Sequence, residues 1–318
     1  MSAIDLNADV GEMHPDLDAR ILEVVTSVNI ACGGHAGDAA SMRRVATLAS
    51  QHEVRIGAHP SYVDSANFGR IRQDVPSHVL RAQIEEQIQR LAEVSPQGVD
   101  YVKPHGALYH AAATEQEVAE ALVSAVLNAS ERVGSSLSLM GQSGSLYLDL
   151  AAAAATAAIL EGFADRAYRA DGRLVPRHDP GAVLTDEQEV VRQVAGLARG
   201  EVVTVDGRLI RMRAQSVCVH SDTPGSAKLA RRIREHLEQS GISVRAQPWA
   251  RSPSARTAGW SPPTTPSPWR RLSTRAVSMT WCQARSTCSC AVPAIGRRRP
   301  SQPFHPTRRI RPHASRCC

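Results

Sequence analysis

The sequence has few of the features that mark secreted or membrane-spanning proteins. Its longest nearly uncharged apolar stretch, Leu150 to Leu160, is shorter than the about 20 residues that a membrane-spanning helix needs. Residues 1–7 have neither the basic segment nor the apolar core of a signal peptide. Residues 1–250 contain two cysteines, Cys32 and Cys218, too few for a disulfide framework. We therefore expect a cytoplasmic protein that does not enter a membrane.

Acidic residues are missing from the last part of the sequence. From Arg251 onward there are thirteen arginines and no Lys, Asp or Glu, whereas residues 1–250 hold 24 basic and 31 acidic groups, a net charge of −7. Residues 248–318 are rich in Ser, Pro, Arg and Thr and show no amphipathic period. We expect this tail to be disordered or to result from a frameshift. A nucleic-acid-binding arm is the less favoured interpretation, so nucleic acid is not an expected partner.

Aromatic residues make up only 4% of the sequence, so the core must be built from Ala, Val, Leu and Ile. Short apolar runs alternate with longer segments of helical period. We predict one strand that begins at residue 101 and others at residues 3–9, 27–32, 54–58, 137–140, 157–163 and 217–219. We predict one helix after residue 145 and others at residues 16–26, 38–52, 77–94, 115–133, 186–197 and 224–239. Residues 202–205 and 208–212 are expected to form a hairpin.

The repeated alternation of strand and helix predicts a parallel sheet with helices outside it. Polar residues gather at the C-terminal ends of successive strands. That distribution is typical of a closed β/α barrel rather than of an open, doubly wound sheet whose site lies at one switch point. We therefore predict one β/α-barrel domain, residues 1–247, with its site at the C-terminal mouth of the strands.

Three histidines stand at equivalent strand ends, together with Asp9 and Lys103. A lone histidine is usually structural, but His35, His59 and His105 together indicate catalysis. Histidine transfers protons near neutral pH and a carboxylate can tune it, so Asp9 with His59 or His105 is a candidate acid–base pair. Asp9, His35 and His59 could instead bind a divalent metal ion. The long-range spacing does not separate these two interpretations.

Other residues at the strand ends are candidates for binding substrate or phosphate. Lys103 is a candidate cation for an anionic substrate group, and Arg70 and Arg166 could clamp a carboxylate or phosphate, with pairing to neighbouring aspartates as the alternative. Glu161 ends an apolar strand, where a buried carboxylate must be paired or take part in proton transfer. The binding candidates are Asn7, Asn29, His35, Asp38, Arg70, Tyr109, Asp165 and Arg166. The two asparagines could equally cap turns, and Asp38 is well placed to cap a helix.

Several familiar motifs are missing. The sequence contains no GxxxxGK[ST], so any use of ATP is not of the P-loop kind. Ser145 stands where a nucleophile elbow needs glycine. Cys32 lies next to two glycines, a setting more typical of a small buried residue than of a nucleophile.

The polar stretches together form an ordered set: DLNADVGE, NIACGGHAGD, GAHPSY followed by FGR, VKPHGALY, EGFADRAY with DGRLVPR, and SVCVHSDTP. Over about residues 3–245 this set closely resembles the LamB/YcsF family. The resemblance implies a seven-stranded β/α barrel of the glycoside hydrolase and deacetylase type. It also implies cytoplasmic, ATP-dependent hydrolysis of 5-oxoproline (pyroglutamate) to L-glutamate by a multi-subunit 5-oxoprolinase, in which this chain is the first component and works with subunits B and C.

Three functions follow as hypotheses, and we favour the oxoprolinase. In that hypothesis Lys103 and Arg70 neutralise negative charge on the substrate or on a phosphoryl group. His59 or His105, oriented by a neighbouring carboxylate, activates water and later protonates the leaving nitrogen. The alternatives are a metal-dependent deacetylase or amidohydrolase on the same barrel, and a non-catalytic component that binds oxoproline.

Overall fold

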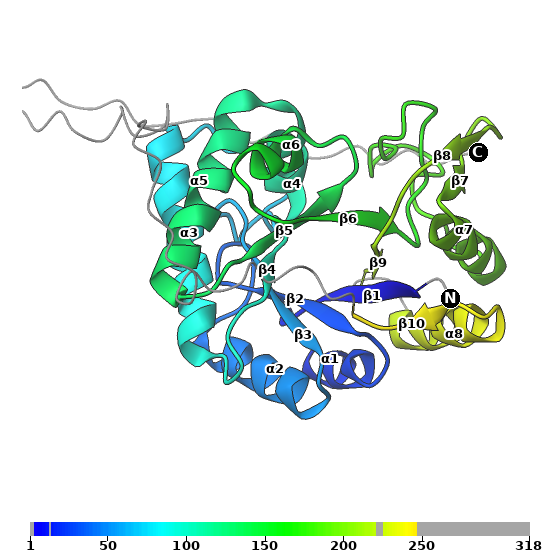
Figure 1. Cartoon of the computed structure of the whole chain (residues 1–318), viewed down its shortest axis with the longest axis horizontal. Helices are drawn as coiled ribbons and strands as arrows, with labels where there is room; N and C mark the ends of the chain where they lie inside the picture. The colour runs from blue at the N-terminus through cyan, green and yellow to red at the C-terminus, as the bar shows by residue number, and fades with distance from the viewer. Residues whose placement is uncertain (1–2, 13, 221–224, 247–318) are drawn as a thin grey trace, which may run out of the picture. The chain divides into compact units, whose positions relative to one another are not determined.

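A closed barrel of parallel strands forms the centre of the fold (Figure 1). The computed structural model describes residues 3–12, 14–220 and 225–246. The strands follow one another in the order β1-β2-β3-β4-β5-β6-β9, and β9 pairs with β1 to close the barrel. They are β1 (Ala3–Val10), β2 (Ser27–Ala31), β3 (Arg55–His59), β4 (Tyr101–Val102), β5 (Ser138–Gln142), β6 (Ala158–Phe163) and β9 (Ser216–Val219). The predicted seven-stranded β/α barrel is thus confirmed. Residues 248–318, predicted to form a tail, lie outside the described residues.

Helices lie around the outside of the barrel (Figure 1). In the described part of the chain they are α1 (Pro15–Leu22), α2 (Ala39–Gln51), α3 (Ser77–Val94), α4 (Gly106–Thr114), α5 (Gln116–Val133), α6 (Leu146–Ala153), α7 (Glu187–Arg199) and α8 (Ser226–Gln239). Helix α3 has the predicted bounds, and the side chain of Asp38 caps α2 by accepting from the backbone N–H of Ser41. None of these helices combines the length and the apolar character that crossing a membrane requires.

Three short strands are additional to the seven strands of the barrel. Strands β7 (Glu201–Val203) and β8 (Leu209–Arg211) form the predicted antiparallel hairpin. Strand β10 (Ser243–Val244) pairs in parallel with residues 3–4 of β1, just ahead of the segment that pairs with β9.

Helix α4 was not predicted, because its sequence shows little separation of polar and apolar residues. It begins directly after His105 and runs through Ala, Leu, Tyr and His. Leu108, Tyr109, Ala111 and Ala112 are nevertheless buried, so packing rather than amphipathic period fixes this helix. The consequence for the site is direct, since α4 carries Tyr109 to the mouth of the barrel.

The barrel interior is polar, and strand β1 shows how the sequence produces it. Asp5, Asn7 and Asp9 alternate with Leu6 and other apolar residues of the helix-facing core. The oxygens of Asp5 accept hydrogen bonds from the hydroxyls of residues 26, 27 and 216, which come from the neighbouring strands and a loop. Because side chains alternate between the two faces of a strand, the period of two places one polar row inside the barrel.

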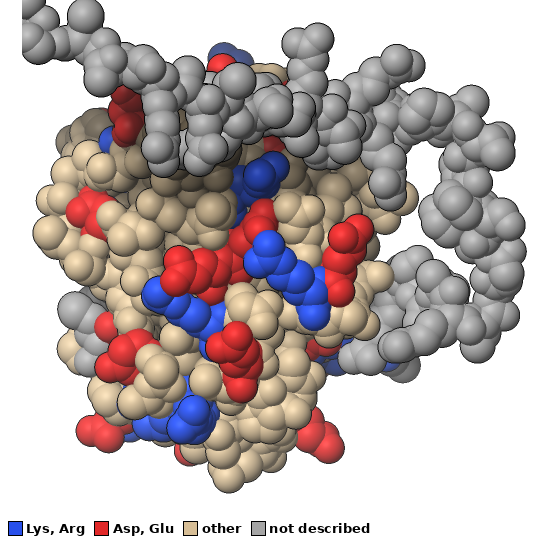
Figure 2. Space-filling model, turned by 90° about the vertical axis from the view of Figure 1, so that its left-hand side faces the viewer, with Lys and Arg blue, Asp and Glu red and all other residues tan. Residues whose placement is uncertain are grey.

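The face that carries α3 and α5 shows arginines beside Asp and Glu (Figure 2). Glu85 of α3 links the two helices: it accepts a hydrogen bond from Asn128 at 2.7 Å and pairs with Arg132 at 3.0 Å, both on α5. The Glu85 side chain is largely buried, so the hydrogen bond and the ion pair offset the cost of removing its charge from water.

Gly57 in β3 provides a test of the packing inside the barrel. A Cβ atom at this position would lie 2.2 Å from the ring of Tyr101, whose buried hydroxyl is 2.8 Å from the Asn29 side-chain oxygen. We expect Gly57→Ala to lower the free energy of unfolding by about 1–3 kcal/mol, because the ring cannot move without breaking its hydrogen bonds. Chemical denaturation measures this loss.

Gly162→Ala in β6 is the matched comparison. Its added methyl would meet the methyl groups of Leu197 at 3.0 Å, and these can shift at low cost. An equal loss of stability in both variants would contradict the special role given to the Tyr101 ring.

Candidate functional site

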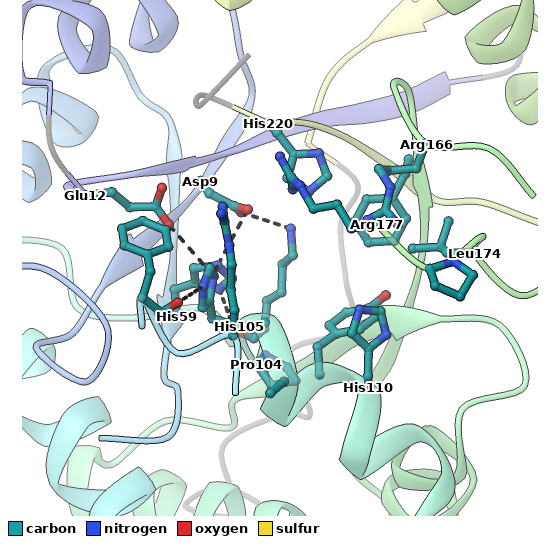
Figure 3. Close-up of a pocket in the computed structure, with 18 of the residues that line it drawn as sticks. Asp9, Glu12, His59, Pro104, His105, His110, Arg166, Leu174, Arg177 and His220 are labelled. Carbon is teal, nitrogen blue, oxygen red and sulfur yellow. Dashed lines mark hydrogen bonds and ion pairs between the residues drawn. The ribbon is translucent and has the colours of Figure 1, made fainter. Parts of the chain in front are cut away.

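A cavity of about 410 Å³ opens at the C-terminal mouth of the barrel (Figure 3). Four of the five predicted catalytic residues line it, namely Asp9, His59, Lys103 and His105. The fifth, Glu161, lies against Lys103 at the cavity floor. The structure therefore brings together side chains that are up to 152 positions apart, counting from Asp9 to Glu161. The remaining lining residues are Glu12, Phe68, Arg70, Pro104, Gly106, Ala107, Tyr109, His110, Phe163, Arg166, Leu174, Val175, Pro176, Arg177, His178 and His220.

Lys103 forms the centre of the cavity floor. Its Nζ lies 2.9 Å from Asp9 Oδ1 and 2.8 Å from Glu161 Oε1, and its side chain is only 3% exposed. Burial by itself lowers the pKa of Lys103, but the surrounding groups, Asp9 foremost, outweigh it and hold that pKa well above its ordinary value. Burial raises the pKa of Asp9, and the charge of Lys103 reverses this and holds it well below the ordinary range. The floor is thus an ionised cluster.

This pairing changes the role expected of Lys103. Two carboxyl groups already balance its charge, so it does not present a free cation to a substrate anion. We interpret it instead as the group that keeps Asp9 and Glu161 together inside the barrel.

Asn7 and Asn29 lie beneath the cavity and do not line it. Asn29 donates to Asp9 Oδ1 and to Asn7 Oδ1, both at 2.8 Å. Asn7 donates to Glu161 Oε1 at 3.2 Å and to the hydroxyl of Ser216 at 2.7 Å. The two amides therefore orient the carboxyl groups of the floor.

The histidines form a compact cluster beside Asp9. His59 Nδ1 lies 2.7 Å from the Lys103 carbonyl and His105 Nε2 lies 3.0 Å from the Phe68 carbonyl. A carbonyl oxygen can only accept, so both of these ring nitrogens carry the proton. The other nitrogens, His59 Nε2 and His105 Nδ1, therefore face each other at 3.1 Å with their lone pairs.

His35 lies behind this pair and does not line the cavity. Its ring stacks on that of His105 with centroids 3.7 Å apart, and its Nε2 is 3.1 Å from Glu12 Oε1. Burial, helped by nearby His59, lowers the pKa of His35 to about 3, so this ring is neutral.

The loop between β3 and α3 holds the cluster in place. Gly69 has a φ of +62°, and its carbonyl accepts from the N–H of Ala107 at 2.9 Å at the start of α4. A Cβ at Gly69 would come within 2.9 Å of the His35 side chain. Only glycine permits both the backbone conformation and this close approach.

His220 lies across the cavity from His59 and His105 (Figure 3) and forms a second proton-transfer pair with Asp165. His220 Nδ1 lies 2.8 Å and 3.1 Å from the two oxygens of the buried Asp165, and its ring stacks on Phe163. Burial lowers the pKa of His220, but the charge and hydrogen bond of Asp165 outweigh it and raise that pKa above its ordinary value. His220 is therefore suited to hold a proton near neutral pH.

The predicted arginines differ in their surroundings. Arg70 is exposed at the mouth, where its guanidinium lies 5.0 Å from the centroid of the Phe68 ring. Arg166 is buried and donates to the carbonyls of Val175 and Ala182, so it holds the loop that forms one wall. Arg177, which was not among the predicted residues, joins Arg70 at the mouth.

Five predicted binding residues do not line the cavity, namely Asn7, Asn29, His35, Asp38 and Asp165, and several lining residues were not predicted. Asp38 caps α2 and does not line the cavity, so the structure gives no support to its proposed binding role. Glu12 and His220 were missed as site residues. Both carried a usable signal, because Glu12 ends the first polar stretch and His220 follows strand β9 directly, at the strand end that His59 occupies in β3.

Two groups in the described part of the chain have the composition of a metal site. Glu12, His35, His59 and His105 offer ligand atoms within 4.8 Å of one another, and so do Asp9, Cys218 and His220. The predicted set of Asp9, His35 and His59 is thus divided between the two groups.

Comparison with known proteins gives consistent results. The model of the LamB/YcsF family matches residues 4–252. The A subunit of 5-oxoprolinase from Streptomyces avermitilis is 49% identical over 251 residues, covering 76% of this chain and 99% of that protein. The corresponding protein of Cutibacterium acnes is 43% identical over 254 residues, covering 77% and 99%. Among solved structures, the lactam utilization protein from Thermus thermophilus has a TM-score of 0.69 at 36% identity and covers 77% of this chain and 100% of its own.

Replacement of Lys103 tests the ionised floor. Lys103→Met leaves Asp9 and Glu161 buried side by side without a counter-charge, and breaking a buried ion pair in this way costs about 3–5 kcal/mol of unfolding free energy. Denaturant titration measures the loss.

Lys228→Met is the matched control, since Lys228 is the only other lysine in the sequence and its side chain is 71% exposed. Its replacement is expected to change stability by no more than about 0.5 kcal/mol. A Lys103→Met protein as stable as the control would show that the floor is not held by charge.

Proposed function

The chain belongs to the LamB/YcsF family, and on that premise we propose that it acts as the A component of an ATP-dependent enzyme that hydrolyses 5-oxoproline to L-glutamate. Subunits B and C are its proposed partners, since the relatives are named as the A subunit of 5-oxoprolinase. The observation that carries the proposal is the cavity itself, which combines cationic side chains at the mouth with two separate proton-transfer groups on opposite walls.

The need for ATP has a chemical reason. An unstrained five-membered lactam is a poor electrophile. Transfer of the terminal phosphoryl group of ATP to the lactam oxygen releases ADP and makes the ring carbon open to attack by water. The carbon–nitrogen bond then breaks as the nitrogen takes up a proton, which leaves an acyl phosphate. A second water molecule hydrolyses this acyl phosphate to free phosphate and the side-chain carboxyl group of glutamate.

The mouth and walls of the cavity suit this substrate. Arg70 and Arg177 can bind the substrate carboxylate or the transferred phosphoryl group, because a guanidinium pairs with such anions through two parallel hydrogen bonds. Phe163 and Leu174 provide apolar surface for the ring methylenes.

The two proton-transfer groups divide the work of hydrolysis. The facing nitrogens of His59 and His105, with the ionised Asp9 beside them, form the side of the cavity where water is activated. On the other wall, Asp165 holds the Nδ1 proton of His220, so Nε2 is the nitrogen left to donate to the leaving amide nitrogen. A carboxylate that orients an imidazole in this way also stabilises its charged form.

Turnover by the reconstituted complex tests the function. The full chain, combined with subunits B and C, should form glutamate and ADP in equal amounts when both 5-oxoproline and ATP are present. Arg177→Ala should raise the KM for 5-oxoproline with a smaller effect on kcat, because Arg177 lies at the mouth and away from the floor. No glutamate formation by the wild-type complex would overturn the proposal.

The role of His220 makes a separate prediction. His220→Gln should lower kcat by about 10²–10⁴-fold, the usual contribution of a general acid. Asp165→Asn removes the charge that raises the His220 pKa, so the acid form should be lost at lower pH and the alkaline limb of the kcat profile should move to lower pH. His52→Gln, at an exposed position after α2, is the control and should change neither. An unmoved profile in Asp165→Asn would show that His220 is not the proton donor.

A further inference from the structure

We propose that Glu12, His59 and His105 bind a divalent transition-metal ion at the edge of the cavity. This site goes beyond the substrate assignment above and does not depend on it, because it rests on the ligand atoms alone. It replaces the metal-ligand set expected from the sequence, which was Asp9, His35 and His59.

The tautomers of the two facing histidines favour a bound cation. Each ring donates its proton to a backbone carbonyl, His59 to Lys103 and His105 to Phe68. The two remaining nitrogens lie 3.1 Å apart, and when both rings are neutral each presents a lone pair to the other. Two such lone pairs repel each other, and a metal ion bound by both nitrogens removes this repulsion. A backbone carbonyl that fixes the outer nitrogen is also the usual support for a metal-bound histidine.

The spacing of the donor atoms also suits a metal ion. Metal–ligand bonds of about 2.0–2.2 Å place neighbouring donors on a tetrahedral ion about 3.3–3.6 Å apart. The two histidine nitrogens are 3.1 Å apart, and His105 Nδ1 lies 3.8 Å from Glu12 Oε1. These separations bracket the tetrahedral value, so small side-chain movements bring all three donors into range of one ion.

His35 belongs to the support of this site and not to its ligands. Its ring is stacked on His105 with an interplanar angle of 7°, and an ion lies close to the plane of each imidazole that binds it. Two parallel rings cannot both direct a lone pair at one ion. His35 Nε2 instead lies 3.1 Å from Glu12 Oε1, where it orients the carboxylate, and among the described residues its Nδ1 has no hydrogen-bond partner.

The other acidic and sulfur donors are less suited to an ion. Asp9 and Cys218 lie 2.9 Å and 3.2 Å from the ammonium group of Lys103. A divalent ion bound by these two residues and His220 would therefore stand next to a buried positive charge. Glu12 Oε1 instead lies 3.1 Å from a ring nitrogen of His35.

Two imidazoles and one carboxylate favour zinc, manganese, iron, cobalt or nickel over magnesium and calcium, which prefer oxygen ligands. Three protein ligands leave one position open, and Glu12, His59 and His105 all line the cavity, so that position faces the substrate space. A bound ion there would polarise an oxygen of the substrate or lower the pKa of a bound water.

Metal titration of the full chain tests the proposal without substrate, ATP or partner subunits. After treatment with a chelator and its removal, the wild-type chain should bind one Zn²⁺ per molecule by calorimetry, and Co²⁺ should give the visible absorption bands of a four- or five-coordinate site. Glu12→Gln and His105→Gln should each weaken Zn²⁺ binding by at least about tenfold, and His35→Gln by about 10–100-fold through the lost support of Glu12.

His110→Gln is the matched control, since His110 lines the same cavity from α4 and lies outside the ligand group. It should bind Zn²⁺ as the wild type does, and circular dichroism should show that every variant is folded. Absence of stoichiometric binding of Zn²⁺ and Co²⁺ to the wild-type chain would overturn the proposal, and so would binding that Glu12→Gln and His105→Gln leave unchanged. Neither result would bear on oxoproline turnover, which is measured separately.

Discussion

The structure depends on one buried cation. Lys103, at the end of β4, lies between Asp9 of β1 and Glu161 of β6 and so connects strands from three sides of the barrel. A buried ion pair costs desolvation energy that only close geometry and further hydrogen bonds can offset. Here Asn29, Asn7 and Tyr109 supply those hydrogen bonds. Burying polar groups in this way costs free energy, so a polar barrel interior indicates a functional role. Here the polar interior forms the floor of the cavity.

Around this floor the site separates its tasks in space. The histidine cluster lies on one wall, where His59 and His105 have fixed tautomers and face each other. The opposite wall carries His220, whose pKa the neighbouring Asp165 raises, so that it holds a proton more readily. In a hydrolysis water must lose a proton and the leaving nitrogen must gain one, and the cavity has one histidine group on each wall for these two steps.

Much of this arrangement could be predicted from the sequence, because it follows from local rules. The alternation of Asp5, Asn7 and Asp9 with apolar residues places one polar row inside the barrel, and Asp38 identified the start of α2. Convergence of Asp9, His59 and Lys103 followed from parallel strands sharing one mouth.

The partners of individual side chains could not be predicted from the sequence in this way. Lys103 was expected to meet a substrate anion, yet its partners come from strands far away in the sequence. The sequence of α4 shows no amphipathic period. No sequence motif predicts that Arg166 donates to loop carbonyls.

Binding of 5-oxoproline at the mouth of the barrel around Lys103 is the claim on which the proposed function rests. A crystal structure of the full chain soaked with 5-oxoproline tests this most directly. We expect density for the ligand in the cavity, with its carboxylate near Arg70 or Arg177 and its lactam group between His220 and the pair of His59 and His105. Ligand bound elsewhere on the chain, or a cavity that stays empty at saturating 5-oxoproline while the ligand is shown to bind in solution, would contradict it.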